Sequence, residues 1–264
     1  MLLNVILGLV LAYLVSIISL KLKYITFDGA VTVFLLASVI FVFGELKWSV
    51  PILAFFVPSS ILSKLKSEKS AELSNKFEKN SVRDSFQVLA NGGIGGILVL
   101  LNYFSPDKIW YLVYLTFLGT VSADTWGTEI GTLTKRKTYN ILTFRKCEQG
   151  ISGGISTIGT VGAFLGGVVV VLFSSPWLNT YPAFLIFVLI ILGFIGSFID
   201  SILGGTIQAK YKCSKCGEIS ERNHHCGVPA TLFSGFKWMN NDLVNFSSGI
   251  ISSIFLVIIL GIWN

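Results

Sequence analysis

The sequence predicts an all-α fold, a polytopic transmembrane helical bundle of about eight spans. Of the 264 residues, 53% are hydrophobic and only 13% are charged, and the mean hydropathy is +0.74. A soluble domain carries about 25% charged residues. The composition therefore excludes the soluble protein classes and indicates an integral membrane protein.

Eight predominantly apolar stretches approach the length of about 20 residues with which a helix crosses a bilayer. We expect spans at 2–20, 29–44, 48–63, 86–104, 109–126, 152–174, 182–203 and 243–263. The second and third stretches are short and are joined tightly around Glu45. The first has neither a basic leading region nor a small-residue cleavage site, so we expect no cleavable signal peptide.

The orientation follows from the basic residues, because Lys and Arg accumulate in short loops on the cytoplasmic side. With eight spans, 18 of the 20 basic residues fall on one side, and the other side receives only Lys47 and Lys108. We therefore predict a multi-pass cell-membrane protein with both termini outside. The net charge of +6 then reflects topology and not binding to nucleic acid. Four tryptophans are expected at the outer interface, namely Trp48, Trp110, Trp177 and Trp263.

Twelve of the 14 acidic residues lie on the same inner side, and the exceptions are Glu45 and Asp107. A transporter would place some polar groups near the midplane of the bilayer. Polar groups at a single depth favour a membrane-embedded enzyme whose active face is cytoplasmic and takes a soluble cosubstrate. We expect one transmembrane domain over residues 1–264, in which residues 205–241 form a cytoplasmic loop.

The position of a carboxylate along its helix separates two groups of acidic residues. Asp28, Asp84 and Asp242 lie at the amino ends of predicted spans, where capping and a functional role are both reasonable interpretations. Asp124 and Asp200 lie at carboxyl ends, where the helix dipole disfavours negative charge. A charge in a membrane is costly without a partner. We therefore expect Asp124 and Asp200 to bind a metal ion, a substrate or a basic side chain.

Asp124 and Glu129 are five residues apart, which is about 140° around a continuous helix. They share a face only if the backbone breaks, and Gly127 permits such a break. The alternative is that Asp124 forms an ion pair with Arg83 and that Glu129 is a solvated loop residue.

Arg83, Gln87 and Asn91 recur at four-residue spacing and so lie on one face of the fourth span. A run of four glycines with one isoleucine follows at 92–96. Hydrogen bonding between helices explains such a stripe, and close helix packing explains the glycines. A guanidinium nevertheless offers a rigid fork of donors that suits phosphate, so Arg83 is a candidate phosphate ligand.

A small, hydroxyl-rich turn precedes the sixth span, after the basic residues Lys135, Arg136, Lys137, Arg145 and Lys146. A helix amino terminus in a basic setting is suited to bind an anion. The candidate phosphate ligands in this turn are Ser152, Gly154, Ser156 and Thr157. Gly and Ser also begin helices for conformational reasons, and Gly159, Ala163 and Gly167 continue a ridge suited to helix packing.

Three of the four cysteines and both histidines lie between Cys213 and Cys226. In a reducing cytoplasm this concentration predicts a zinc knuckle and not a disulfide. The ligands would be Cys213, Cys216 and Cys226 with one of the adjacent histidines, and His225 is our candidate. A full set of four protein ligands would make the site structural. The alternative is free thiols in a loop, and Cys147 stands apart with no expected role.

Two further segments complete the inner face. Asn241, Asp242 and Asn245 either cap the eighth span or complete a metal and nucleotide site. Residues 63–80 mix Lys and Glu and predict an exposed amphipathic helix at the anionic inner surface.

Several motifs together resemble a known family over essentially the whole chain. They are Asp28-Gly29-Ala30, Arg83-Asp84 through Gln87 to Asn91-Gly92-Gly93, Ser122-Ala123-Asp124-Thr125 with Glu129 and Gly131, the turn at 152–160, Asp200-Ser201 with Gly204 and Gln208, and Asn241-Asp242 with Asn245. This set resembles the integral membrane family that contains animal transmembrane protein 19 and the plant phytyl-phosphate kinase of tocopherol synthesis.

The resemblance implies that an isoprenyl monophosphate is phosphorylated to its diphosphate by a nucleoside triphosphate, with CTP expected, and Mg²⁺. Asp124, Glu129 and Asp200 become candidates for metal binding or base catalysis, and Arg83 becomes a phosphate clamp. The candidates for binding the cosubstrate are Asp84, Gln87, Asn91, Ser152, Gly154, Ser156, Thr157, Asn241, Asp242 and Asn245. An apolar groove between spans would take the prenyl tail.

Two rival functions use the same residues or the same setting. A cytidylyltransferase that acts on a lipid phosphate would need the same face, metal and anionic substrates. A transporter would need a polar path to the outside, and the outer halves of the predicted spans offer almost none. The chain has no Walker A sequence and no protein-kinase signature, so a kinase of this kind must hold phosphate by other means.

Overall fold

A computed structural model describes residues 2–69, 82–134 and 136–263, and this part of the chain is mostly helical. Its helices are α1 (Leu2–Lys21), α2 (Phe27–Lys69), α4 (Ser85–Phe104), α5 (Lys108–Thr132), α6 (Thr157–Ser174), α7 (Ala183–Thr206) and α8 (Asn241–Trp263), with a 3-10 turn at Ser175–Trp177. The predicted amphipathic helix over 63–80 is the end of α2 as far as Lys69. The rest of it falls outside the described residues.

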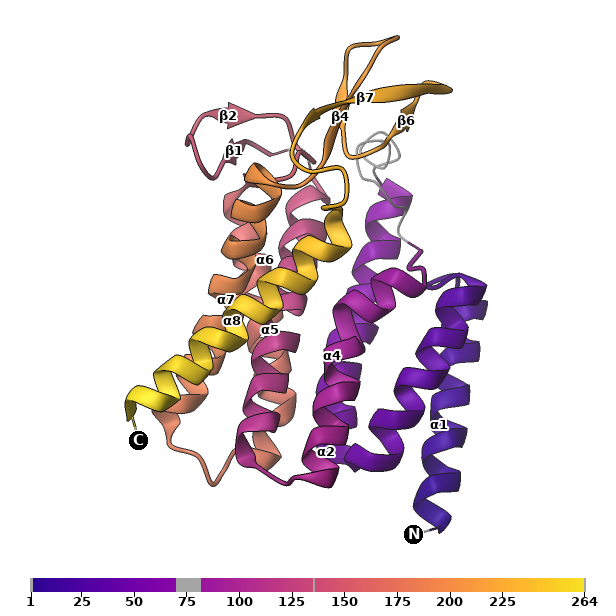
Figure 1. Ribbon diagram of the computed structural model, residues 1–264, viewed down its shortest axis with the longest axis vertical. Coiled ribbons are helices and arrows are strands. Elements are labelled where there is room, and N and C mark those ends of the chain that lie inside the picture. The colour runs from indigo at the N-terminus through magenta and orange to yellow at the C-terminus, as the bar shows by residue number, and fades with distance from the viewer. Residues whose placement is uncertain (1, 70–81, 135, 264) are drawn as a thin grey trace.

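Helix α2 consists of two arms that meet at Glu45. The backbone there is not helical, with φ 51° and ψ −155°, and the chain reverses direction at this point (Figure 1). Hydrogen bonds hold the two arms against different helices: Ser16 Oγ donates to Ala30 O at 2.7 Å, Tyr114 OH to Trp48 O at 2.5 Å, and Trp126 Nε1 to Ser59 Oγ at 3.2 Å. The arms correspond to the second and third predicted spans.

Six helices in the described part of the chain, α1, α2, α4, α6, α7 and α8, are long and apolar enough to cross a membrane. Helix α5 does not reach this level of hydropathy, although it is 25 residues long. Its polar Thr116, Thr120 and Ser122 are fully buried. Because these side chains face protein and not lipid, the helix can carry them without exposing polar groups to hydrocarbon.

Helix α5 forms the centre of the bundle and packs against α2, α4, α6, α7 and α8. Tyr111, Tyr114 and Phe117 are fully buried along it. Trp48 is also buried and packs on Tyr111 and Tyr114, with ring centroids 5.2 and 4.8 Å apart. The expectation that Trp48 lies at the membrane interface is therefore wrong, because its indole is part of the core. The side chain of Trp263 lies outside the described residues.

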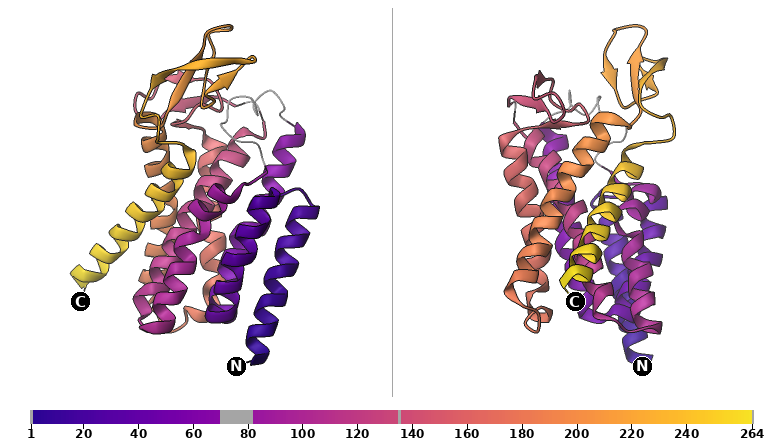
Figure 2. Two further views of the ribbon diagram at one scale, coloured as in Figure 1. Left: turned by 45° about the vertical axis from the view of Figure 1, so that its right-hand side comes forward. Right: turned by 60° about the vertical axis from the view of Figure 1, so that its left-hand side comes forward.

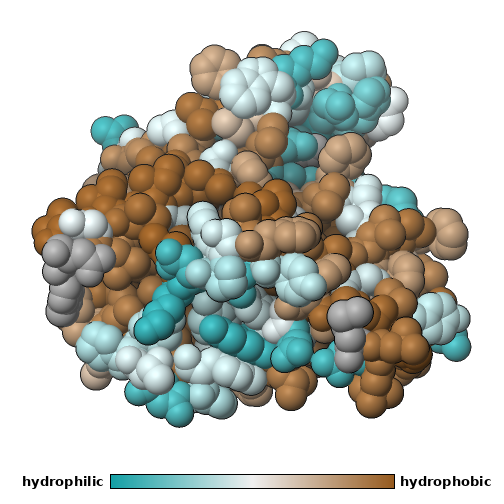
Figure 3. Space-filling model, turned by 60° about the horizontal axis from the view of Figure 1, so that its bottom comes forward, coloured by the Kyte–Doolittle hydropathy of each residue, from teal (hydrophilic) through white to brown (hydrophobic). Residues whose placement is uncertain are grey.

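The outer surface of the bundle is strongly apolar. Leu2 in α1 is 74% exposed, Phe187 in α7 is 60% exposed and Ile262 in α8 is 81% exposed. With the end that carries the termini turned forward, Figure 3 shows wide apolar areas beside a band of polar residues. A soluble monomer rarely exposes so much apolar surface, so these helix faces are suited to contact lipid.

Two small antiparallel sheets lie at the end of the bundle opposite the termini (Figures 1 and 2). The first contains β1 (Thr138–Asn140), β2 (Lys146–Cys147) and β3 (Gly154–Ile155) in the order β2-β1-β3; the second contains β4 (Lys210–Cys213), β5 (Ile219–Ser220), β6 (His224–His225) and β7 (Val228–Ser234) in the order β5-β4-β7-β6. The all-α expectation is thus correct only for the bundle. Strands this short show too little alternation to be recognised from sequence.

Helices α5 and α6 approach each other at backbone distance. A Cβ added at Gly166 would lie 2.5 Å from Ser122 O, and one added at Gly127 would lie 3.2 Å from Ala163 Cβ. The small-residue ridge predicted on α6 therefore serves helix packing. This close contact fixes the polar end of α5 against the turn that begins α6.

Candidate functional site

A cavity of about 300 Å³ opens at the sheet end of the bundle. It lies between α2, α4, α5, α6, α7 and α8. Its lining includes the predicted residues Arg83, Gln87, Asn91, Asp124, Glu129, Ser152, Gly154, Ser156, Asp200, Asn241 and Asn245. Asp84, Thr157 and Asp242 were also predicted but do not line it. Predicted residues from five separate segments of the chain thus converge on one polar site.

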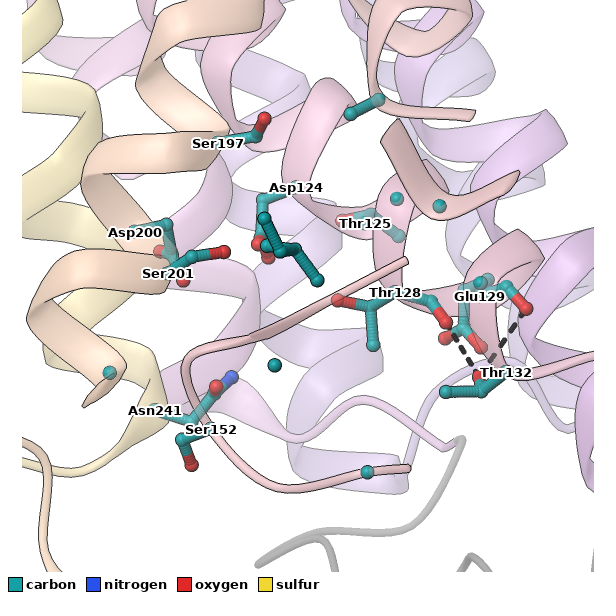
Figure 4. Close-up of a pocket in the computed structure, with 18 of the residues that line it drawn as sticks. Asp124, Thr125, Thr128, Glu129, Thr132, Ser152, Ser197, Asp200, Ser201 and Asn241 are labelled. Atoms are coloured by element: carbon teal, nitrogen blue, oxygen red, sulfur yellow. Dashed lines mark hydrogen bonds between the residues drawn. The ribbon is translucent and has the colours of Figure 1, made fainter. Parts of the chain in front are cut away.

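Two carboxylates face each other on one side of the cavity. Asp124 in α5 lies beside Asp200 and Ser201 in α7 (Figure 4), and the side chains of Asp124 and Asp200 share a hydrogen bond. Asp200 is only 7% exposed and also accepts a hydrogen bond from Ser248 Oγ at 3.1 Å. Two carboxylates in contact, one buried and one partly buried, need either a shared proton or a bound cation, because like charges repel strongly at this range.

Glu129 lies on the other side of the cavity. Helix α5 is continuous through Gly127 to Thr132, so the backbone break that Gly127 would permit does not occur, and Gly127 instead allows close contact with α6. Asp124 and Glu129 reach the same cavity because it is wide enough to meet two faces of α5. Glu129 is a helical, partly buried residue that accepts a hydrogen bond from Ser63 Oγ at 2.7 Å, and it is not the solvated loop residue of the alternative interpretation.

The backbone of Arg83 is tied to the start of α2. Its N–H donates to Tyr24 O at 3.0 Å, and its carbonyl accepts from Thr26 N at 3.0 Å. The side chain is 6% exposed, and Nη1 donates to Ser60 Oγ at 2.6 Å. Burial lowers the pKa of Arg83, and the negative charge of Glu129 opposes this shift. Glu129 is therefore close enough to act on the charge of Arg83.

Carboxamide groups supply much of the remaining cavity wall. Gln87 and Asn91 lie on one face of α4, as predicted, and Asn245 projects from α8. Within the described part of the chain, Gln87 Oε1, Asn91 Oδ1 and Asn245 Oδ1 are buried and have no hydrogen-bond partner. A buried polar atom without a partner costs about 1–3 kcal/mol. Three such oxygens around one cavity indicate a place for a bound polar group.

The non-helical segment before α6, residues 149–156, lines the cavity. Helix α6 begins at Thr157, and Ser156 caps it by accepting a hydrogen bond from Gly159 N at 3.2 Å. The expected start of the sixth span at 152 is therefore five residues too early, since residues 154–155 form β3. Ser152 and Gly154 line the cavity. Of the basic residues that precede the turn, Arg136, Lys137, Arg145 and Lys146 are exposed and are not part of the lining. Lys135 falls outside the described residues.

Sequence reasoning missed a polar group that comes from the second sheet. Glu221 lines the cavity, is 8% exposed and accepts a short hydrogen bond from Ser152 Oγ. Lys210 Nζ donates to Ser152 O and to Gly205 O, both at 3.3 Å. Burial lowers the pKa of Lys210, and Glu221 opposes this shift. Only the β4–β5 hairpin brings Glu221 to the cavity, so no local sequence pattern could have indicated it.

Gln208 also lines the cavity, and its side chain is 2% exposed. Among the described residues, its Nε2 has no hydrogen-bond partner. Gln208 belongs to the motifs that carry the family resemblance, but the sequence alone indicates no binding or catalytic role for it. The amide adds a donor to the site beside the three unpartnered oxygens.

The three carboxylates predicted at helix amino ends, Asp28, Asp84 and Asp242, differ in whether they cap the helix. Asp84 caps α4 by accepting from Gln87 N at 2.9 Å. Asp28 accepts from Thr26 Oγ1 at 2.6 Å and from Ser85 N at 3.0 Å, so it connects the starts of α2 and α4. Asp242 is buried in the first turn of α8, which is capped by Asn240 through Leu243 N at 3.0 Å.

A second, apolar pocket adjoins the polar cavity. It has a volume of about 60 Å³ and is lined by side chains of α1, α2 and α4, including Val33, Ile40 and Phe56. Arg83, Gln87 and Asn91 line both pockets. The site therefore offers charged and hydrogen-bonding groups on one side of Arg83 and hydrocarbon on the other.

The cysteine and histidine side chains that the sequence singled out converge on the second sheet. Single ligand atoms of Cys213, Cys216, His225 and Cys226 all lie within 4.8 Å of one another. His224 instead contacts Asn223, with 3.1 Å between Nδ1 and Oδ1. Of the two histidines, His225 is the one that joins the cluster.

Comparison with known proteins places the chain in a family. The model of the integral membrane protein family DUF92 matches residues 10–253. The chain belongs to the DUF92 family. This confirms the family resemblance drawn from the motifs. No solved structure matches the chain.

Several relatives of this DUF92 chain are known by sequence. Protein PGR of Arabidopsis thaliana is 28% identical and covers 95% of this chain and 94% of its own length. An uncharacterized membrane protein of Methanocaldococcus jannaschii is 26% identical over 79% of this chain and 82% of its own length. Protein VTE6, chloroplastic, of Arabidopsis thaliana is 22% identical over 78% of this chain and 58% of its own length.

Proposed function

We propose that this DUF92 protein is a membrane-embedded isoprenyl phosphate kinase. It would transfer the terminal phosphoryl group of a nucleoside triphosphate, with CTP expected, to a phytyl-type lipid monophosphate. The observation that carries the proposal is the junction at Arg83, Gln87 and Asn91, where the polar cavity meets the apolar pocket. A molecule with an anionic head and a hydrocarbon tail fits both sides of that junction.

Arg83 is the residue best placed to hold the head group of the lipid. Its guanidinium is buried, and its backbone is fixed at both ends by hydrogen bonds. A planar guanidinium binds phosphate through two parallel hydrogen bonds. The negative charge of Glu129 offsets part of the cost of burying this cation. The pocket of about 60 Å³ would take the first carbons of the tail, and the rest would lie against the lipid-facing helices.

The residues on the Asp124 side fit a magnesium ion. Mg²⁺ prefers oxygen ligands and commonly binds one or two carboxylates together with substrate phosphates. Asp124 and Asp200 supply the carboxylates, and Asn245 Oδ1 is a buried oxygen without a partner in the described chain. When bound, the ion would neutralise charge on the phosphates of the nucleotide.

The reaction requires little acid–base chemistry from the protein. An oxygen of the lipid monophosphate attacks the terminal phosphorus of the nucleotide, the bond to the bridging oxygen breaks, and its electron pair leaves with the nucleoside diphosphate. The second pKa of a phosphate monoester is about 6, so the attacking oxygen is already ionised at neutral pH. The protein then contributes positioning and charge neutralisation. Gln87, Asn91, Gln208 and Asn241 would orient the phosphates, and the turn at Ser152–Ser156 would hold the nucleotide.

The topology proposed with this function has eight spans. It counts each arm of α2 as a span and includes α5. The chain then forms one membrane domain with both termini outside, and the segment 205–241 lies with the cavity at the cytoplasmic face. The nucleotide would enter from the cytosol, and the lipid from the inner leaflet.

A cytidylyltransferase is the alternative that the same cavity accommodates, because it would use the same anionic substrates and metal. It differs in which phosphorus is attacked. A transporter is the second alternative. The cytidylyltransferase differs from the kinase in its labelled lipid product, and a transporter would show substrate flux without any chemical product.

The test uses purified full-length protein in lipid nanodiscs, prenyl monophosphates of several lengths, Mg²⁺, and CTP labelled at the α or the γ phosphorus. We expect the γ label, and not the α label, to appear in a lipid diphosphate together with CDP. Transfer of the α label with release of pyrophosphate would establish the cytidylyltransferase instead. Substrate flux in proteoliposomes without turnover would establish the transporter.

The variant Asp124→Asn, which keeps the shape of the side chain and removes its charge, should lose at least about 100-fold in kcat, the size of effect seen when one transition-state contact is removed. Asp107→Asn is the matched control. Asp107 caps α5 at the opposite end, accepting from Ile109 N at 2.9 Å, and Asn caps equally well. Full turnover by Asp124→Asn would contradict the proposal.

A further inference from the structure

We propose that Cys213, Cys216, His225 and Cys226 bind a zinc ion in a closed tetrahedral site. Their four ligand atoms lie within 4.8 Å of one another, and no other role has been assigned to them. Three cysteine sulfurs and one histidine nitrogen are a ligand set that structural zinc sites use. This inference does not depend on the proposed kinase activity.

The separations among the ligand atoms of Cys216, His225 and Cys226 are close to those that a zinc ion requires, and Cys213 Sγ lies within 4.8 Å of all three. Zn–S and Zn–N bonds of about 2.3 and 2.0–2.1 Å in a tetrahedron place two sulfurs about 3.8 Å apart and a sulfur about 3.5 Å from a nitrogen. Cys216 Sγ and Cys226 Sγ are 3.7 Å apart. His225 Nδ1 lies 3.4 Å from each of these sulfurs. The side chains are therefore already arranged around a central position.

The backbone explains why the ligands converge. Cys213-Ser214-Lys215-Cys216 forms the turn between β4 and β5, which is closed by Gly217 N donating to Cys213 O at 2.9 Å. Gly217 has φ +76°, a conformation that glycine adopts without steric cost. His225 and Cys226 lie at the turn between β6 and β7, where Cys226 and Gly227 also have positive φ values. Two tight hairpin turns thus present two ligands each to the same point.

The surroundings of the histidine also fit a metal ligand. Its Nδ1 faces the sulfurs, and its Nε2 lies 3.8 Å from Glu218 Oε2. Histidines that bind metals commonly direct the second ring nitrogen toward a carboxylate, a carbonyl or water, which fixes the tautomer. The adjacent His224 faces away from the sulfurs toward Asn223. The chain therefore contains a matched control for the histidine.

Zinc in this position would stabilise one wall of the cavity. The four protein ligands leave no open coordination position, which assigns the ion a structural and not a catalytic role. The ligands connect β4 to β6 and β7. Lys210 lies at the start of β4 and Glu221 directly follows β5, and both contact Ser152 in the wall of the cavity. An ion that holds this sheet would also hold the two side chains that the sheet contributes.

The primary test is the metal content of the purified full-length protein, measured by inductively coupled plasma mass spectrometry after removal of loosely bound metal. We expect about one zinc per chain. Replacement by Co²⁺ should give the absorption bands of tetrahedral cobalt with thiolate ligands. A protein that contains iron instead, or that holds no metal after incubation with zinc, would overturn the proposal.

Variants then locate the ion. Cys216→Ser and His225→Ala should each retain less than about one tenth of the zinc of the wild type. Cys147→Ser and His224→Ala, which change the same residue types outside the cluster, should retain all of it. Equal zinc in all four variants would overturn the assignment.

A disulfide between Cys216 and Cys226 is the competing arrangement, and mass spectrometry of the alkylated protein distinguishes it. Protein prepared under reducing conditions should show four thiols once the metal is removed. A disulfide that persists would contradict the zinc site. Because these measurements do not involve turnover, they stand whether or not the kinase assay succeeds.

Discussion

The carboxylates of Asp124 and Asp200 could be singled out from the sequence, but for a reason that the structure modifies. They were expected at helix carboxyl ends, where the dipole disfavours them. Helix α5 continues to Thr132 and α7 to Thr206, so both carboxylates lie inside their helices, and what sets them apart is their mutual contact. The proximity of Glu129 to Arg83 could not be predicted, because residues 46 apart in the chain approach each other only in the tertiary structure.

The contact between the two carboxylates leads to a prediction about Asp200→Asn. If Asp200 serves to hold a cation, neutralising it should remove at least about 100-fold of kcat. The same change relieves the repulsion between the buried Asp200 and the adjacent Asp124 and keeps an oxygen that can accept from Ser248. We therefore expect the melting temperature in detergent to stay the same or to rise.

Thermal unfolding followed by tryptophan fluorescence, measured on the same preparations as turnover, checks this prediction. Asp107→Asn again serves as the control for the chemical change itself. A parallel fall in melting temperature and activity would instead mean that Asp200 acts by stabilising the fold.

At the scale of helices and strands, hydrophobic periodicity and length located most elements. The predicted bounds 86–104 correspond to α4 (Ser85–Phe104), and 2–20 to α1 (Leu2–Lys21). The predicted bounds were less accurate at the helix ends beside the cavity. Helix α5 extends six residues past the predicted end at 126, and α6 starts at Thr157 and not at the predicted 152. Helix bounds there depend on packing between α5 and α6, which hydropathy does not report. The tight connection around Glu45 could be predicted, because charged residues there separate two apolar stretches of the sequence.

The close contact of α5 with α6 predicts that Gly166→Ala destabilises the protein. The added Cβ would meet Ser122 O at 2.5 Å and Ala123 Cα at 3.0 Å, and backbone atoms of a packed helix cannot move aside. Overpacking of this kind costs about 1–3 kcal/mol in the free energy of unfolding. At about 2–4 °C per kcal/mol, the melting temperature should fall by roughly 2–12 °C.

Gly93→Ala in α4 is the matched control. Its Cβ would meet only the side chain of Leu89 at 3.7 Å, an ordinary contact, and Ala favours a helix over Gly. Its melting temperature should be unchanged or slightly higher. Equal effects of the two substitutions would show that the α5–α6 contact does not limit stability.

For the whole molecule, the division of charge along the sequence corresponds to a division in space. The segments predicted to be cytoplasmic supply both sheets, the cavity opens at that end of the bundle, and both termini lie at the opposite end (Figure 1). The family followed from the motifs together. The contribution of the second sheet to the cavity did not follow, because Glu221 reaches Ser152 only once β4 and β5 have paired and docked against the turn before α6.

This arrangement predicts which cysteines a membrane-impermeant maleimide can label in intact cells. All four native cysteines lie in the strands of the two sheets or in the turns that connect them, so the wild type should remain unlabelled until the membrane is permeabilised. The variants Ser105→Cys and Thr180→Cys place exposed thiols in the loops at the end that carries the termini. They should react in intact cells. Thr143→Cys, an exposed position in the β1–β2 connection, should react only after permeabilisation.

The physical basis of this prediction is the imbalance of 18 basic residues to two, since Lys and Arg in short loops are retained on the cytoplasmic side. Each labelling reaction should be quenched before lysis, and a cytosolic thiol protein should report leakage. Labelling of Thr143→Cys in intact cells, with Ser105→Cys protected, would invert the orientation. The cavity would then face away from cytosolic nucleotide, and this outcome would contradict a kinase that draws its phosphoryl donor from the cytosol.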